Sequence, residues 1–304
     1  MLIQFARQIE MYYRLIQARK SPQRVELANI YLERSRMGIP PRKKIKTVIA
    51  LIRQNKVNEA VRVAGQTEFD NFVNVNGKRF LDFTPEEKLV CIEARYIALT
   101  TPQAIVSLMR AVDHVIKHDV QGAFVECGVF MGGSIIAILR TLLFLGVTNR
   151  DIYLFDTFEG MPKPDENDIF YTGDSASTLF DFFRGSGNSS NWVRADLDSV
   201  KERVLATGYP KERIHFVKGM VEDTLPRQAP EQVALLRLDT DFYRSTKHEL
   251  VHLYPKISRN GLLILDDYGV FRGAQQATDE YFRENNIQIF LNRIDEAVRL
   301  GIKP

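Results

Sequence analysis

The run VALLRLDTDFYRST, residues 233–246, places acidic side chains directly after an apolar segment. Val233 to Leu238 has the nearly continuous apolar character of a strand that is buried on both faces, as strands of parallel sheets are. Asp239 and Asp241 follow at once. A buried carboxylate without a partner costs several kcal/mol to desolvate, so two of them at a strand end indicate a group of opposite charge nearby.

Similar runs alternate with helical segments from about residue 122 onward, and this alternation predicts an α/β domain with a mostly parallel sheet. The predicted strands are GAFVECGVF, DIYLFD, RIHFVKG, VALLRLD and GLLILDD, and helices are predicted from Ser134, near 197–206, from Ser245 and over 273–285. Only Ile294-Asp295-Glu296 separates the last two runs, IQIFLNR and AVRLGIKP. So short a connection predicts a C-terminal antiparallel hairpin.

The chain before residue 122 is predicted to be helical, with helices over much of 1–65. Thr84 followed by Pro85 and by Glu87 predicts a capping box at the start of a further helix that runs to about Ala98. Another helix is predicted over 102–118. We therefore divide the chain into a helical N-terminal extension, 1–83, and a C-terminal domain, 84–304.

Composition and charge restrict the class of protein. No apolar run approaches the ~20 residues that span a bilayer, and the two cysteines among 304 residues favour a reducing, cytoplasmic setting. The first 60 residues carry 13 Lys/Arg against 4 Asp/Glu, a charge of +9, so the remainder carries −6 of the total +3. A solvated helical face explains this excess, and a docking surface for an acidic partner is the alternative. Neither aromatic interleaving nor zinc-finger spacing supports nucleic-acid binding.

Ligands of open parallel sheets bind beyond the carboxyl ends of the strands, so these ends are the candidate site. The first strand ends in ECGVFMGGS, where Glu126 is followed by a glycine-rich turn. Gly128 lets the backbone approach a ligand closely, and Ser134 is predicted to cap a helix whose N–H groups attract an anion. The alternative is an ordinary tight turn, since neither GxGxxG nor a P-loop lysine is present.

The second predicted strand ends at Asp156, in FDTFEGMP. An acidic residue in this place commonly binds ribose hydroxyls, and an Asx-type turn is the alternative. The following stretch, 157–190, is long and polar, as lids and binding loops are.

The fourth and fifth predicted strands end in Asp239-Thr240-Asp241 and in Asp266-Asp267. Neighbouring parallel strands would gather these carboxylates in one crevice, where their repulsion requires a cation. All-oxygen ligands suit Mg²⁺. Helix caps and turn acids are the alternative, because Thr246 and Glu249 already form a plausible capping box.

Two other chemistries match short motifs. His248-Glu249-Leu250-Val251-His252 fits the zinc motif HExxH, although three fixed positions are often met by chance. Asp239-Thr240-Asp241 is a DxD, which would suit a metal-dependent glycosyltransferase. That reading leaves the second acidic strand end and the glycine turn unexplained.

Taken together, ECGVFMGGS, FDTFEGMP, LLRLDTDFYRSTKHEL and GLLILDDYGVFRGAQQATDEYF resemble the macrocin O-methyltransferase (TylF-like) family over about residues 99 to 304. The resemblance implies a Rossmann-like class I methyltransferase fold. It also implies Mg²⁺-dependent transfer of a methyl group from S-adenosylmethionine to a hydroxyl, typically on a sugar of a natural product such as an antibiotic. The partners would be a small hydroxylated, glycosylated substrate and further copies of the chain in a homo-oligomer.

The resemblance also implies residue roles. Cofactor contacts would come from Glu126, Gly128, Ser134, Asp156, Gly219 and Met220, and the metal ligands would be Asp239, Asp266 and Asp267. Asp239 would also be the general base, with Asp241 in reserve. More distant relatives, the catechol O-methyltransferases, have a lysine base three residues after the first metal-binding aspartate, but Phe242 stands there in this chain.

Overall fold

The computed structural model describes residues 80–94, 97–183 and 190–304. The helices predicted over 1–65 and their basic face lie outside these residues. The chain divides between Tyr96 and Ile97 into two units, which are described separately. In the first, α6 (Pro85–Ala94) begins with the predicted capping box. The Thr84 N–H donates to Glu87 Oε2 at 2.8 Å, and the Glu87 N–H donates to Thr84 Oγ1 at 3.2 Å.

The second unit is built on a seven-stranded sheet in the order β3-β2-β1-β4-β5-β7-β6. The strands are β1 (Ala123–Cys127), β2 (Ile152–Asp156), β3 (Ile214–Lys218), β4 (Val233–Leu238), β5 (Ile257–Leu265), β6 (Asn292–Arg293) and β7 (Arg299–Ile302). The first five are parallel, β7 is antiparallel to β5, and β6 is antiparallel to β7. The predicted mostly parallel sheet with a C-terminal antiparallel hairpin is confirmed.

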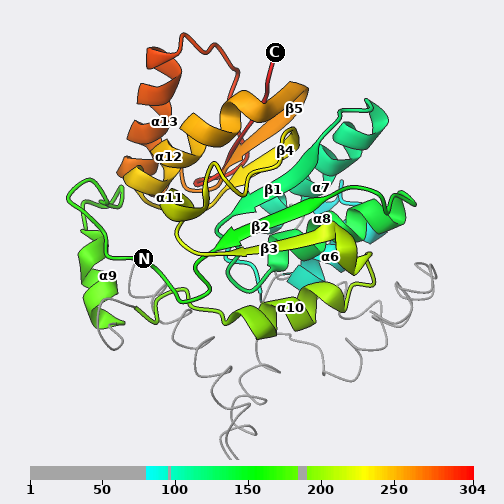
Figure 1. The fold of residues 1–304 in the computed structure, drawn as a ribbon, viewed down its shortest axis with the longest axis horizontal. Helices are drawn as coiled ribbons and strands as arrows, with labels where there is room; N and C mark the ends of the chain where they lie inside the picture. The colour runs from blue at the N-terminus through cyan, green and yellow to red at the C-terminus, as the bar shows by residue number, and fades with distance from the viewer. Residues whose placement is uncertain (1–79, 95–96, 184–189) are drawn as a thin grey trace, which may run out of the picture. The chain divides into compact units, whose positions relative to one another are not determined.

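Helices cover both faces of this sheet, with α7, α8 and α10 on one side and α11, α12 and α13 on the other (Figure 1). Their bounds are α7 (Pro102–Lys117), α8 (Gly133–Phe144), α9 (Ala176–Phe182), α10 (Leu197–Leu205), α11 (Val221–Thr224), α12 (Tyr243–Leu253) and α13 (Arg272–Glu284), with short 3-10 turns at Lys211–Arg213 and Tyr254–Lys256. In the part of the chain that is described, no helix has both the length and the apolar character needed to cross a membrane.

The core lies between the sheet and these helices because the central strands are apolar on both faces. Every residue of β1 and β4 is buried. On the face that α12 covers, the core includes Val125, Leu236, Leu263, Leu250 and Leu253. With both faces covered, the carboxyl ends of the strands are where polar side chains gather.

Two predicted helix starts are wrong. Gly132, with φ +86°, is the N-cap of α8, so Ser134 lies inside the first turn and does not cap the helix. Similarly, α12 begins at Tyr243, three residues before Thr246, and its N-cap Phe242 makes no side-chain cap bond. The capping box predicted for Thr246 and Glu249 is therefore absent from this helix. In both cases the helix starts earlier because a residue distant in sequence, Ile97 for α8 and Asp168 for α12, accepts a hydrogen bond from an N–H group of the first turn.

Candidate active site

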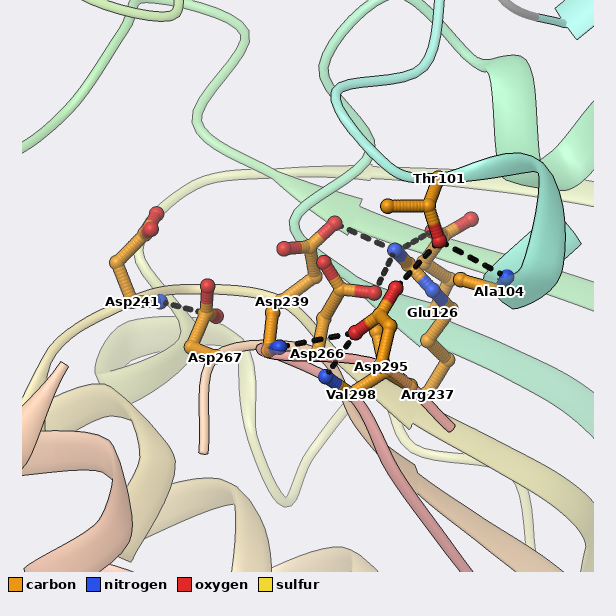
Figure 2. A network of polar contacts seen from close by, with 11 residues as sticks. Thr101, Ala104, Glu126, Arg237, Asp239, Asp241, Asp266, Asp267, Asp295 and Val298 are labelled. Carbon is orange, nitrogen blue, oxygen red and sulfur yellow. Dashed lines mark hydrogen bonds and ion pairs between the residues drawn. The ribbon is translucent and has the colours of Figure 1, made fainter. Parts of the chain in front are cut away.

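The ends of β4 and β5 bring three aspartates together. Leu238 pairs with Leu265 in the parallel register, so Asp239 and Asp266 follow side by side. The ladder continues one step beyond the strands, because the Asp266 N–H donates to the Leu238 carbonyl oxygen at 2.9 Å. One carboxylate oxygen each from Asp239, Asp266 and Asp267 lies within 4.8 Å of the others (Figure 2). The predicted convergence of these side chains is confirmed.

Arg237 is a central residue of the site that the sequence analysis missed. Its side chain is 4% exposed and makes ion pairs with three carboxylates. Nη1 contacts Glu126, the register partner of Arg237 on β1, and also Asp239 Oδ2 at 2.6 Å. Nη2 contacts Asp266 Oδ1 at 2.5 Å. The one available signal was a single basic residue inside an apolar run, which a buried strand tolerates only when it is paired.

Burial dominates the electrostatics of this cluster. It raises the pKa of Glu126 to about 7, although the Arg237 guanidinium acts in the opposite direction. Burial likewise raises the pKa values of Asp239, Asp266 and Asp267, and mutual repulsion adds to the effect at Asp239 and Asp267. Glu126 and the three aspartates carry four negative charges when all are ionised and Arg237 carries one positive charge, which is −4 + 1 = −3. Such a cluster attracts a further cation.

The side chain of Glu249 holds the loop between Asp239 and Asp241 in place through a hydrogen bond from Thr240. This carboxyl is fully buried, and the Thr240 hydroxyl donates to its two oxygens at 3.0 and 3.1 Å. Asp241 has φ +67°, and its N–H donates to Asp267 Oδ2 at 3.0 Å. In Figure 2, Asp241 lies beside Asp267, at the end of the cluster away from Arg237. The loop thus ties one acidic strand end to the other.

This role of Glu249 argues against a zinc site at HExxH. The His248 and His252 rings do lie close, with centroids 4.4 Å apart. Within the described ranges, however, the aspartate trio is the sole group of three or more His, Cys, Asp or Glu side chains arranged to hold a metal. The glutamate that would serve a zinc enzyme as base is instead bound to Thr240.

The cap of α12 comes from a distant residue, Asp168. Its Oδ1 accepts the Tyr243 N–H at 2.9 Å, and its Oδ2 accepts the Asp165 N–H at 2.7 Å. Burial raises the pKa of Asp168 to about 6. Asp168 belongs to the long stretch predicted as a lid, so this stretch is attached directly to the helix that follows Asp241.

The same stretch also contacts the exit of β5. Phe170 forms an antiparallel bridge with Phe271, and their rings lie 4.4 Å apart. The Tyr171 N–H donates to the Val270 carbonyl oxygen at 3.0 Å. The stretch is not structureless, since it contains α9. It contacts the segments that follow both acidic strand ends.

The exit of β1 passes very close to Asp239. Gly128 has φ +83°, and a Cβ placed on it would lie 1.7 Å from the Asp239 carbonyl oxygen. The close approach at Gly128 is therefore between the backbone after β1 and the backbone after β4. Further along the turn, the Gly133 N–H donates to the Ile97 carbonyl oxygen at 3.1 Å. Ser134 is buried in the first turn of α8.

Asp156, at the end of β2, binds the turn that follows β1. Its Oδ2 accepts the N–H groups of Val129 and Phe130 at 2.7 and 3.0 Å, and its Oδ1 accepts that of Phe158 at 2.6 Å. Beyond β3, the Gly219 N–H donates to the Asp156 carbonyl oxygen at 3.0 Å, and Met220 is the N-cap of α11. The predicted cofactor residues thus lie at three adjacent strand exits, β1, β2 and β3.

A further missed contact joins the C-terminal hairpin to α7. Thr101, the N-cap of α7, bonds Asp295, whose other oxygen accepts the N–H groups of Ala297 and Val298 at 2.9 and 2.8 Å. Figure 2 shows this contact next to the Arg237 cluster. Nearly two hundred positions separate the partners in sequence, so no local pattern could reveal it.

Comparison with known proteins agrees with this geometry. The model of the macrocin O-methyltransferase (TylF) family matches residues 23–299. The chain belongs to the macrocin O-methyltransferase family. The motifs alone placed the start of the resemblance near residue 99, which was too late, because most of the N-terminal region also fits the family model.

Individual relatives carry out O-methylation. Demethyldecarbamoylnovobiocin O-methyltransferase of Streptomyces niveus is 31% identical over 189 residues, which are 62% of this chain and 69% of that protein. Mycinamicin III 3''-O-methyltransferase of Micromonospora griseorubida is 29% identical over 189 residues, 62% of this chain and 71% of that protein. The solved O-methyltransferase NovP superposes with a TM-score of 0.61 at 28% identity, covering 68% of this chain and 82% of that structure.

These findings confirm the predicted class of enzyme. The protein is an O-methyltransferase with the Rossmann-like class I methyltransferase fold. Calicheamicin methyltransferase CalS11 shares the fold with a TM-score of 0.53 at 20% identity, covering 78% of this chain and 92% of that one. The glycosyltransferase alternative that rested on Asp239-Thr240-Asp241 is wrong, because the chain belongs to a family of O-methyltransferases.

Proposed function

We propose that this macrocin-family enzyme uses S-adenosylmethionine and Mg²⁺ to methylate a hydroxyl group on a sugar of a natural product or glycoconjugate. The observation that carries the proposal is the gathering of Asp239, Asp266 and Asp267 beside the exit of β1. The hydroxyl-methylating relatives supply the reaction class.

The residues at the strand exits fit the methyl donor. Glu126 Oε2 is buried and has no hydrogen-bond partner in the described part of the chain, so it can accept a hydrogen bond from an amino group. Three N–H donors hold the Asp156 carboxylate at the exit of β2, the place from which an acidic residue commonly binds ribose hydroxyls. The cofactor contacts we propose are Glu126, Gly128, Ser134, Asp156, Gly219 and Met220. When bound, S-adenosylmethionine would supply the methyl group.

The aspartate trio fits a hard divalent cation. Its donors are all carboxylate oxygens, which Mg²⁺ prefers. Arg237 contacts Oδ2 of Asp239 and Oδ1 of Asp266, so this guanidinium does not use the second oxygen of either carboxylate. A divalent ion would reduce the formal charge of the cluster from −3 to −1. When bound, Mg²⁺ would supply a Lewis acid that stabilises negative charge on the reacting oxygen.

The chain must also accept the proton of the hydroxyl. The resemblance assigns this role to Asp239, and that assignment stays a prediction. The geometry favours Asp241, because Asp239 Oδ2 already contacts Arg237 and would also hold the metal, and two cations reduce the basicity of a carboxylate. Among the described residues, Asp241 has no ion pair with a lysine or arginine. We therefore propose Asp239 as a ligand and Asp241 as the general base.

Binding measurements test the reaction class. Calorimetric titration with S-adenosylhomocysteine, a UDP-sugar and NAD⁺, with and without Mg²⁺, should show binding of S-adenosylhomocysteine alone. Binding of the UDP-sugar in its place would refute the proposal. Metal analysis of the same sample should show no stoichiometric zinc.

Two variants separate the ligand from the base. Asp239→Asn should weaken Mn²⁺ binding and abolish methyl transfer, while S-adenosylhomocysteine still binds. Asp241→Asn should abolish transfer but weaken Mn²⁺ binding much less than Asp239→Asn does, because it removes a nearby charge and no ligand. Transfer is followed as labelled methyl incorporation into a panel of glycosylated acceptors. Near-normal turnover by Asp241→Asn would return the base role to Asp239.

The organisation of the chain is also a proposal. We propose that residues 1–83 form a helical extension to a methyltransferase domain at 84–304, and that the enzyme is a homo-oligomer. The helical sequence pattern supports the extension, and the family match from residue 23 indicates that relatives share most of it. Light scattering of the full chain and of a truncation that begins near residue 80 tests both points. A monomeric full-length chain would refute the oligomer.

A further inference from the structure

Arg237 occupies the centre of the cluster that the proposed function assigns to a metal, and the following inference rests on that function. We propose that the Arg237 guanidinium is a permanent cation of the site, which holds the acidic strand ends together without metal and limits the affinity for the divalent ion. Arg237 is thus a positioning residue whose charge sets how tightly the ion binds.

The contacts of Arg237 span three adjacent strands. Nη1 bonds Glu126 on β1 and Asp239 after β4, and Nη2 bonds Asp266 after β5. Two of these three carboxylates are proposed metal ligands. A guanidinium can serve several carboxylates at once because its five donors are fixed in one plane. Its burial at 3% exposure keeps these contacts away from solvent screening.

The charge of Arg237 opposes a second cation. With all four carboxylates ionised, the formal charge of the cluster is −3 with Arg237 and −4 without it. Charges this close in a protein interior interact strongly enough to change a binding constant by at least about tenfold. Removal of the positive charge should therefore tighten the binding of a divalent ion.

Removal of Arg237 would also take away contacts that position Asp239 and Asp266, and this loss would weaken the binding of the ion. Backbone hydrogen bonds limit the loss. The Asp239 N–H donates to the Cys127 carbonyl oxygen at 2.8 Å, and the Asp266 N–H donates to that of Leu238 at 2.9 Å. Asp267 accepts the Asp241 N–H at 3.0 Å. Each proposed ligand is thus held by a contact that does not involve Arg237, so the effect of charge should dominate.

Mn²⁺ binding measures this directly, because the spectrum of the free ion in electron paramagnetic resonance reports its concentration. The wild type is compared with Arg237→Gln, which keeps hydrogen-bond donors but loses the charge, and with Arg237→Lys, which keeps the charge. Arg237→Gln should bind Mn²⁺ at least about tenfold more tightly. The Mn²⁺ affinity of Arg237→Lys should stay within about threefold of that of the wild type, because lysine carries the same net charge as arginine.

A matched control is Arg150→Gln. Arg150 donates to the carbonyl oxygens of Val120 and Gly122, before β1, so it lies at the opposite end of the strands. This variant should leave Mn²⁺ affinity unchanged.

A second readout is thermal stability. Mn²⁺ should raise the melting temperature of Arg237→Gln more than that of the wild type, since an ion that binds the folded state more tightly stabilises it more.

The outcomes separate this inference from the proposed function. If the wild type binds Mn²⁺ and folded Arg237→Gln binds it no more tightly, the inference fails while the metal site stands. If no variant binds Mn²⁺, both fail. If Arg237→Gln does not fold, Glu126→Gln decides. This variant removes a negative charge but no proposed ligand, so Mn²⁺ binding should weaken at least about threefold, and unchanged binding would overturn the inference.

Discussion

Substitution of Gly128 by alanine tests whether the exit of β1 shapes the metal site. The added Cβ would lie 1.7 Å from the Asp239 carbonyl oxygen, whereas real Cβ contacts are essentially never under 3.0 Å. The two backbones must therefore separate by at least 3.0 − 1.7 = 1.3 Å. Both are held in the sheet, since the Asp239 N–H donates to the Cys127 carbonyl oxygen and the Gly128 N–H to that of Phe155, at 2.8 and 2.9 Å.

The magnitude follows from two terms. A side chain at φ +83° costs about 1–2 kcal/mol, and overpacking costs about 1–3 kcal/mol more. Gly146→Ala isolates the first term. Gly146 has φ +70°, but no atom lies within 4 Å of its added Cβ. Urea denaturation should thus show a loss of about 1–2 kcal/mol for Gly146→Ala and of about 2–5 kcal/mol for Gly128→Ala.

The functional consequence is larger than the loss of stability. Protein ligands must hold a metal to within about 0.2 Å, so a displacement of this size would remove Asp239 from the proposed coordination shell. Mn²⁺ affinity should fall at least about tenfold in Gly128→Ala and stay unchanged in Gly146→Ala. Equal stability of the two variants, with wild-type Mn²⁺ affinity in both, would refute the reasoning.

Three further predictions concern the supports of the site. Burial raises the pKa of Asp168 to about 6, so the folded state binds this proton more tightly than the unfolded state does. The free energy of unfolding should therefore decrease from about pH 4 to pH 6, by no more than about 3 kcal/mol. In urea denaturation, Asp168→Asn should lack this part of the pH dependence. Burial also raises the pKa of Glu249 well above its usual value, so Glu249→Gln should change stability by less than about 0.5 kcal/mol, whereas Glu249→Ala should lose about 2 kcal/mol or more. Thr101→Val should lose about 1–2 kcal/mol of thermal stability, because it removes the cap of α7 and the bond to Asp295, and Thr101→Ser should retain most of it.

Each of these has an outcome that contradicts it. An unchanged pH slope in Asp168→Asn would mean that this carboxyl is ionised at all the pH values tested. A large loss of stability in Glu249→Gln would show that the loop between Asp239 and Asp241 needs the ionised form of Glu249. Equal stability of Thr101→Val and Thr101→Ser would show that the hydroxyl contributes nothing.

The sequence alone determined the strands and the residues at their ends. Apolar runs such as Val233 to Leu238, punctuated by acids and glycines, are local signals, because burial on both faces of a sheet selects the residues of one continuous segment. The pairing of β4 with β5 then followed from chain order, and with it the meeting of Asp239 and Asp266. The capping box at Thr84 was equally readable, because its partners are three positions apart.

Only the tertiary structure decided what supports these ends. Arg237 meets Glu126 across 111 positions, Asp168 meets Tyr243 across 75, and Thr101 meets Asp295 across 194. None of these contacts has a spacing that a helix or a strand imposes. The same reason explains the wrong helix starts at Ser134 and Thr246. A first turn takes its partners from whatever lies near it in space, and here those were the Ile97 carbonyl and the Asp168 carboxylate.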